Sequence, residues 1–62
     1  MNPKKVSIHA EMIKDRANNI MLGATLVETE GLHLEVGRYL KNEVSIIKRY
    51  LEVIEQEIET IK

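Results

Sequence analysis

Residues 10–27 read AEMIKDRANNIMLGATLV, and this stretch decides the fold. Alanines stand seven residues apart at positions 10, 17 and 24, and larger apolar residues stand seven apart at positions 13, 20 and 27. Two apolar series with this repeat are typical of helices that pack lengthwise against other helices. Small side chains let helices approach closely, and small residues layered against large ones fill space without voids. The stretch therefore predicts a helix in close contact with another helix.

The flanking residues predict where two helices begin and end. Asn2 can cap free backbone N–H groups, and Pro3 suits the first helical position. Gly31 follows the first apolar repeat and is suited to the left-handed conformation that ends many helices. We therefore expect an all-α antiparallel helical hairpin in a single domain, with helix 1 at about 3–30, a turn around Gly31 and helix 2 at about 32–61. The alternative is one continuous helix through Gly31.

The second half of the chain continues the repeat with larger residues. Its apolar series predict that helix 2 supplies the bulkier half of the core. The predicted oligomer core comprises Ala10, Ile13, Ala17, Ile20, Ala24, Val27, Leu40, Val44, Ile47, Leu51, Ile54 and Ile58.

Chain length makes association with other chains the expected source of stability. The 62 residues form one domain at most, and a chain this short buries a small fraction of its surface. Disulfides, metals or oligomerisation usually stabilise such scaffolds, and the absence of cysteine removes disulfides and thiolate metal sites. We therefore expect a homodimer that forms a four-helix bundle; the alternatives are a tetramer or larger helical assembly, and a monomer or hetero-oligomer that docks its apolar face on another protein.

Helix 1 also carries apolar residues away from its core repeat. A helix that is apolar on several faces is buried on several faces. We expect this second stripe to contact a protein partner if dimerisation leaves it exposed, which makes the chain a small regulatory or adaptor module. The candidate partner-binding residues are Ile8, Met12, Leu22 and Leu26.

Basic residues gather in the middle of helix 2, where they are Arg38, Lys41, Lys48 and Arg49. Such a patch could contact phosphates, although the whole chain has a net charge of −1 and nucleic-acid modules are usually clearly basic. Binding of structured RNA is therefore the alternative function.

Catalysis, metal binding and membrane insertion have little support in the sequence. It has no glycine-rich phosphate loop and no metalloprotease motif. Glu30 and His33 have the E-x-x-H spacing of di-metal bundles, but the predicted core lacks the further carboxylates that such sites need. No apolar run is long enough to span a bilayer, and Lys4 and Lys5 are not followed by a signal-peptide core. We expect a cytoplasmic protein without enzymatic activity, cofactor or metal.

A chain of this length, folded at mid-length, with alanine at one core position and Ile or Val at the other in helix 1, resembles the Rop-type helical hairpins. The resemblance is one of architecture. It implies dimerisation into an antiparallel four-helix bundle and binding of paired RNA loops on the polar outer face of helix 1. The residues themselves leave the orientation of the two hairpins open.

Overall fold

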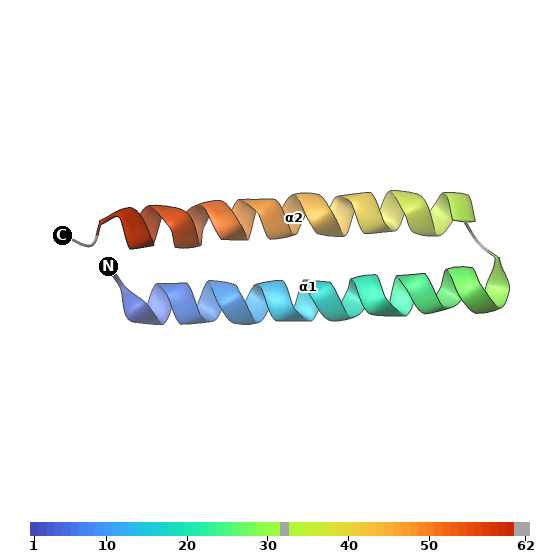
Figure 1. Cartoon of the computed structure of the whole chain (residues 1–62), viewed down its shortest axis with the longest axis horizontal. Helices are drawn as coiled ribbons and strands as arrows, with labels where there is room; N and C mark the ends of the chain where they lie inside the picture. Colours follow the sequence, from blue (N-terminus) through green and yellow to red (C-terminus); the bar gives the residue numbers. More distant parts are fainter. Residues whose placement is uncertain (32, 61–62) are drawn as a thin grey trace.

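The computed structural model describes residues 1–31 and 33–60, which form two helices packed side by side as an antiparallel hairpin (Figure 1). Helix α1 is Pro3–Glu30 and helix α2 is His33–Glu59. The hairpin predicted from the sequence is confirmed, and both chain termini lie at the end opposite the turn (Figure 1). Residues 32 and 61, the predicted limits of helix 2, lie outside the described residues.

Both ends of α1 are capped as the sequence predicts. The side chain of Asn2 accepts a hydrogen bond of 3.2 Å from the backbone N–H of Lys5, and Pro3 begins the helix. At the other end, Gly31 adopts a left-handed conformation with φ 68° and ψ 22°, and its N–H donates to the carbonyl oxygen of Val27 at 3.2 Å. The chain reverses at this glycine, so the alternative of one continuous helix is wrong.

Replacement of Gly31 with alanine should destabilise the hairpin by about 1 kcal/mol, because a Cβ atom disfavours the left-handed conformation. Nothing lies within 4 Å of the position of that Cβ atom, so backbone strain is the expected cause. Urea unfolding would measure the loss. Gly31→Asn is the matched control and should lose less, because asparagine tolerates positive φ. Equal losses in the two variants would contradict this explanation.

The two helices approach each other closely at Gly23. This residue is buried, and a Cβ atom on it would lie 2.7 Å from Cδ2 of Leu40 and 3.3 Å from Cγ1 of Val36. Glycine therefore lets the side chains of α2 rest directly on the backbone of α1. We call the whole contact between α1 and α2 the seam.

The seam is narrow and encloses little apolar surface. Among the described residues, Val36 is the one apolar side chain that is buried, with 7% of its surface exposed. The larger apolar residues along the rest of the hairpin are half-buried or exposed. Neither described helix combines the length and the apolar character needed to cross a membrane. The hairpin by itself thus has almost no dry interior.

Candidate interaction surfaces

Contacts across the seam recur every seven residues. Because the helices are antiparallel, seven residues forward along α1 correspond to seven residues backward along α2. All the contacting pairs therefore belong to one register. The contacting pairs are Asn2 with Glu57, His9 with Tyr50, Arg16 with Glu43, and Gly23 with Val36.

Arg16 and Glu43 form an ion pair at the centre of the seam. The Nη1 atom of Arg16 donates to Oε1 of Glu43 at 3.1 Å and to Oε2 at 3.4 Å. Glu43 is 2% exposed, whereas the side chain of Arg16 reaches solvent. The hydrogen bond and the charge of Glu43 raise the pKa of Arg16 above its ordinary value. A buried carboxylate is thus neutralised by a cation that stays partly hydrated.

His9 and Tyr50 form the next contact toward the chain termini. Their rings meet edge to face, with centroids 5.8 Å apart and planes inclined by 75°. The Nδ1 atom of His9 lies 2.8 Å from the carbonyl oxygen of Lys5, to which an Nδ1–H group donates. The aromatic pair therefore packs part of the seam, and Nδ1 of His9 keeps a hydrogen-bond partner within its own helix.

Glu57 joins the ends of the two helices. Its Oε1 accepts a hydrogen bond of 2.9 Å from the backbone N–H of Asn2, and its Oε2 lies 3.7 Å from Nζ of Lys5. The hydrogen bond from Asn2 is the main cause that lowers the pKa of Glu57; burial opposes this lowering, and the positive charges of Lys5 and the N-terminus add to it. These contacts hold α1 and α2 together at the end of the hairpin opposite the turn, which we call the open end.

Acid should weaken the contacts that Glu57 makes with Asn2 and Lys5. Because the folded pKa of Glu57 lies below its ordinary value of 4.5, its contribution to stability is present above that pH and is lost as the pH falls through the folded pKa. Thermal melts between about pH 7 and about pH 3 should show a smaller fall in melting temperature for Glu57→Gln than for the unmodified chain. Glu52→Gln removes an exposed carboxylate and is the matched control. An identical pH profile in the unmodified chain and the Glu57 variant would contradict the prediction.

The twelve predicted core residues divide into two sets. The first set is half-buried in the seam and comprises Ile13, Ile20, Val27, Leu40, Ile47 and Ile54. The second set is exposed and comprises Ala10, Ala17, Ala24, Val44, Leu51 and Ile58. The alanines therefore do not make the close contact within the hairpin, which occurs at Gly23, and their burial in an oligomer stays a prediction.

The exposed set lies on one side of the hairpin, which we call the alanine face. Each of its members follows a seam contact by one residue, as Ala17 follows Arg16 and Val44 follows Glu43. One residue is a rotation of about 100°, and in antiparallel helices the two rotations carry the side chains to the same side. Val44, Leu51 and Ile58 are 40–52% exposed on this face.

The other side of the hairpin carries an apolar groove near the turn. Leu22 and Glu35 each precede a seam residue by one and so turn to the side opposite the alanine face. The lining of the groove, which we call the tyrosine groove, is Asn19, Leu22, Gly23, Leu26, Glu35, Val36 and Tyr39.

Only two of the four predicted partner-binding residues line the same groove. Leu22 and Leu26 are exposed and line the tyrosine groove, and Tyr39 of α2, which the prediction did not include, completes it. Ile8 is exposed nearer the open end, and Met12 is half-buried. The four residues therefore do not make one groove.

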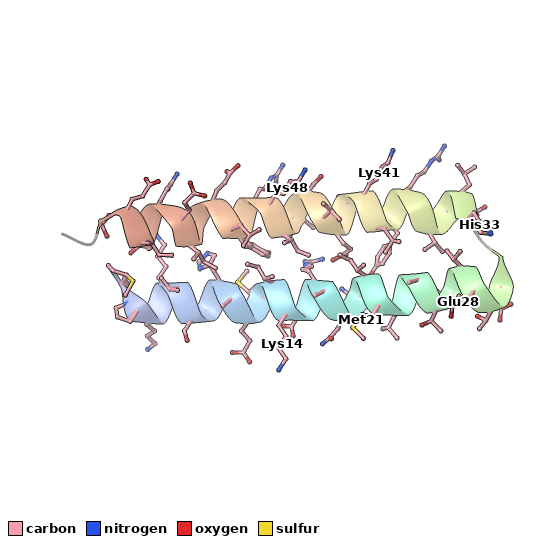
Figure 2. All side chains as sticks on the ribbon, in the orientation of Figure 1. Lys14, Met21, Glu28, His33, Lys41 and Lys48 are labelled. Atoms are coloured by element: carbon pink, nitrogen blue, oxygen red, sulfur yellow. The ribbon has the colours of Figure 1, made fainter. Side chains whose placement is uncertain are left out.

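The candidate RNA-binding residues all lie at the surface of α2. Arg38, Lys41, Lys48 and Arg49 are exposed, and Figure 2 shows Lys41 and Lys48 pointing away from α1. Glu43, the acidic residue in the same stretch, turns into the seam instead and pairs with Arg16. We call this outer surface of α2 the basic face.

Residues with metal-binding side chains are dispersed over the hairpin. In residues 1–31 and 33–60, no three His, Cys, Asp or Glu residues lie close enough together to hold a metal ion. Comparison of the chain with protein-family models, with curated proteins and with solved structures finds no match.

Proposed function

We propose that the chain is a non-enzymatic helical module that self-associates into a four-helix bundle and acts through protein–protein interaction. The observation that carries this proposal is the amount of apolar surface that the hairpin leaves uncovered. Large exposed residues such as Leu22, Leu51 and Ile58 greatly outnumber buried ones in the described part of the chain. Surfaces of this kind mark contacts with other proteins.

The position of the alanine face supports a bundle of four helices. In such a bundle each helix touches two neighbours, so it carries two adjacent apolar strips. The seam uses one strip, and the alanine face lies directly beside it on both α1 and α2. A second hairpin placed on this face would enclose Val44, Leu51 and Ile58 of both copies in one interior.

Light scattering after size exclusion over a dilution series tests self-association. We expect a mass of about 14 kDa, twice the 7.2 kDa of one chain. Leu51→Lys places a charge in the proposed interior and should return the mass to that of one chain, because burying an unpaired charge is very costly. A monomer at every concentration of the unmodified chain would refute the proposal.

A matched variant separates the bundle interior from a partner site. Leu22→Lys with Leu26→Lys adds charge on the tyrosine-groove side, where the residues are similarly exposed. We expect this variant to keep the dimer mass and the melting temperature. A sharp fall in both would assign the groove to the oligomer core and would exclude it as a partner site.

Binding of structured RNA on the basic face is the second candidate. The position of Glu43 favours RNA binding. Its carboxylate lies in the seam with Arg16, so it does not lie among the four exposed basic side chains of the basic face. We expect binding that weakens steeply with salt and is lost in Lys41→Glu with Lys48→Glu. Lys4→Glu with Lys14→Glu changes the net charge equally on α1 and should bind RNA better than the α2 variant. Equal losses in both would contradict a specific site on α2.

A further inference from the structure

The tyrosine groove lies between the two helices near the turn. Its floor is at the close approach of α1 and α2, where Gly23 has no side chain and Val36 is buried. Leu22 and Leu26 of α1 form one wall, and Tyr39 of α2 belongs to the other. The groove has a volume of about 380 Å³, within the range of about 300–1,000 Å³ that is typical of ligand sites. It is therefore large enough to admit apolar side chains of another molecule.

The shape of the groove suits a third helix. Leu22 and Leu26 are one helical turn apart on α1, and Glu35 and Tyr39 are one turn apart on α2. Rows with this spacing form ridges along a helix, and the ridges of one helix pack into the grooves of another. An extended peptide would find no partners here for its own backbone N–H and C=O groups, because both bordering segments are helices that bond theirs internally. A helix brings no such unpaired groups along its length.

The charges beside the groove are negative. Glu35 is the one charged residue of its lining. Asp15 lies on the same side of the hairpin, because it precedes the seam residue Arg16 by one. The ion pairs among the described residues use the carboxylates of Glu43 and Glu57, so Asp15 and Glu35 belong to neither pair. Two exposed carboxylates, one on each helix, are therefore open to the cations of a partner.

Basic residues limit the length of this acidic region. Arg49 precedes the seam residue Tyr50 by one, so it lies on the same side of the hairpin but closer to the open end. Arg38 belongs to the basic face and does not line the groove. The acidic region thus extends along α1 from Leu26 to Asp15, which is about 16 Å at a rise of about 1.5 Å per residue. A partner helix of about three turns spans this length.

We infer that the tyrosine groove binds an amphipathic helix of a partner protein, whose apolar stripe is flanked by lysine or arginine. The stripe covers Leu22, Leu26 and Tyr39, and the flanking cations meet Glu35 on one side and Asp15 on the other. Complementary charges of this kind select the partner and fix its register in the groove. This inference rests on the proposed role in protein–protein interaction and names the chemistry of the partner.

Two synthetic peptides of about 15 residues, long enough to form a helix, test the inference. Both carry the same leucine stripe on an alanine background, and the positions that flank the stripe are lysine in one peptide and glutamate in the other. Fluorescence anisotropy of the labelled peptides should show that the lysine peptide binds about tenfold more tightly or better at low salt. Equal affinity of the two peptides, or no binding of either, would overturn the inference.

Charge reversal on the protein locates the bound peptide. Asp15→Lys with Glu35→Lys should invert the preference, so that the glutamate peptide binds more tightly than the lysine peptide. Glu28→Lys with Glu52→Lys is the matched control, because it changes the net charge equally at exposed positions, and Figure 2 shows Glu28 pointing away from α2. The control should keep the preference for the lysine peptide. Similar effects of the two variants would overturn the inference, because the charge of the whole chain would then select the peptide.

Truncation of the apolar wall separates this site from the proposed oligomer interface. Leu22 and Leu26 are 65% and 45% exposed, so Leu22→Ser with Leu26→Ser should keep the fold and the dimer mass but abolish binding of the lysine peptide. Leu51→Ser, on the alanine face, should lower the mass and leave the peptide affinity unchanged. Undiminished binding to the Leu22 and Leu26 variant would overturn this inference alone. A monomeric chain that binds the lysine peptide through Leu22 and Leu26 would support it and overturn the proposed self-association.

Discussion

Replacement of Gly23 with leucine should separate the two helices at their close approach and destabilise the fold by about 1–3 kcal/mol. Even the first added atom would lie 2.7 Å from Cδ2 of Leu40 and 3.3 Å from Cγ1 of Val36, so both side chains of α2 have to shift to admit a leucine. Helix propensity acts in the opposite direction, since glycine is about 1 kcal/mol worse than alanine in a helix. The steric effect should prevail, because two packed side chains of α2, Val36 and Leu40, have to move at the point of closest approach.

Chemical denaturation of the Gly23 variant beside Thr25→Leu tests this prediction. Thr25 is exposed on the same helix, so the control adds the same side chain without touching α2. Its stability should change by no more than about 0.5 kcal/mol. Equal stability of the two variants would mean that α1 and α2 do not approach each other at Gly23.

Replacement of Arg16 with methionine should lower the melting temperature markedly. Methionine keeps the long apolar stem and the helix propensity of arginine but leaves Glu43, which is 2% exposed, without its partner. An unpaired buried carboxylate is strongly destabilising, whereas an apolar pair of similar size is often as stable as the original ion pair. The double variant Arg16→Met with Glu43→Leu should therefore melt well above the single variant.

A double-mutant cycle that includes Glu43→Leu measures the coupling within this pair. Lys14→Met removes one positive charge from the outer side of α1, where Figure 2 shows Lys14 pointing away from α2, and it should leave the melting temperature nearly unchanged. If Arg16→Met behaves like this control, Glu43 does not depend on Arg16.

Local signals made the hairpin predictable. Asn2, Pro3 and Gly31 each act on backbone groups within a few residues, so the ends of α1 follow from the residue types alone. The series with Ile13 and Ile20 likewise marks the side of α1 that must be covered.

Apolar periodicity could not predict which face of each helix contacts the other helix. On α1, apolar residues lie on both sides of the series formed by Ile13, Ile20 and Val27. The sequence pattern does not indicate which of these two sides contacts α2. The structure places polar residues at the contact, where the antiparallel register brings Arg16 to Glu43 and Lys5 to Glu57. Gly23, seven residues from Arg16, was the available signal, because a glycine inside a helix often marks close packing.

The placement of both termini at one end also sets the order in which the hairpin opens and closes. Contacts near the turn join residues close in sequence, whereas Arg16 and Glu43 are 27 residues apart and Asn2 and Glu57 are 55 apart. The entropy lost on closing a loop grows with its length, so closure from the turn outward meets the smallest cost at each step. Amide protons near the termini should therefore exchange with solvent through local fraying, while those beside Gly23 should exchange only when the whole hairpin unzips.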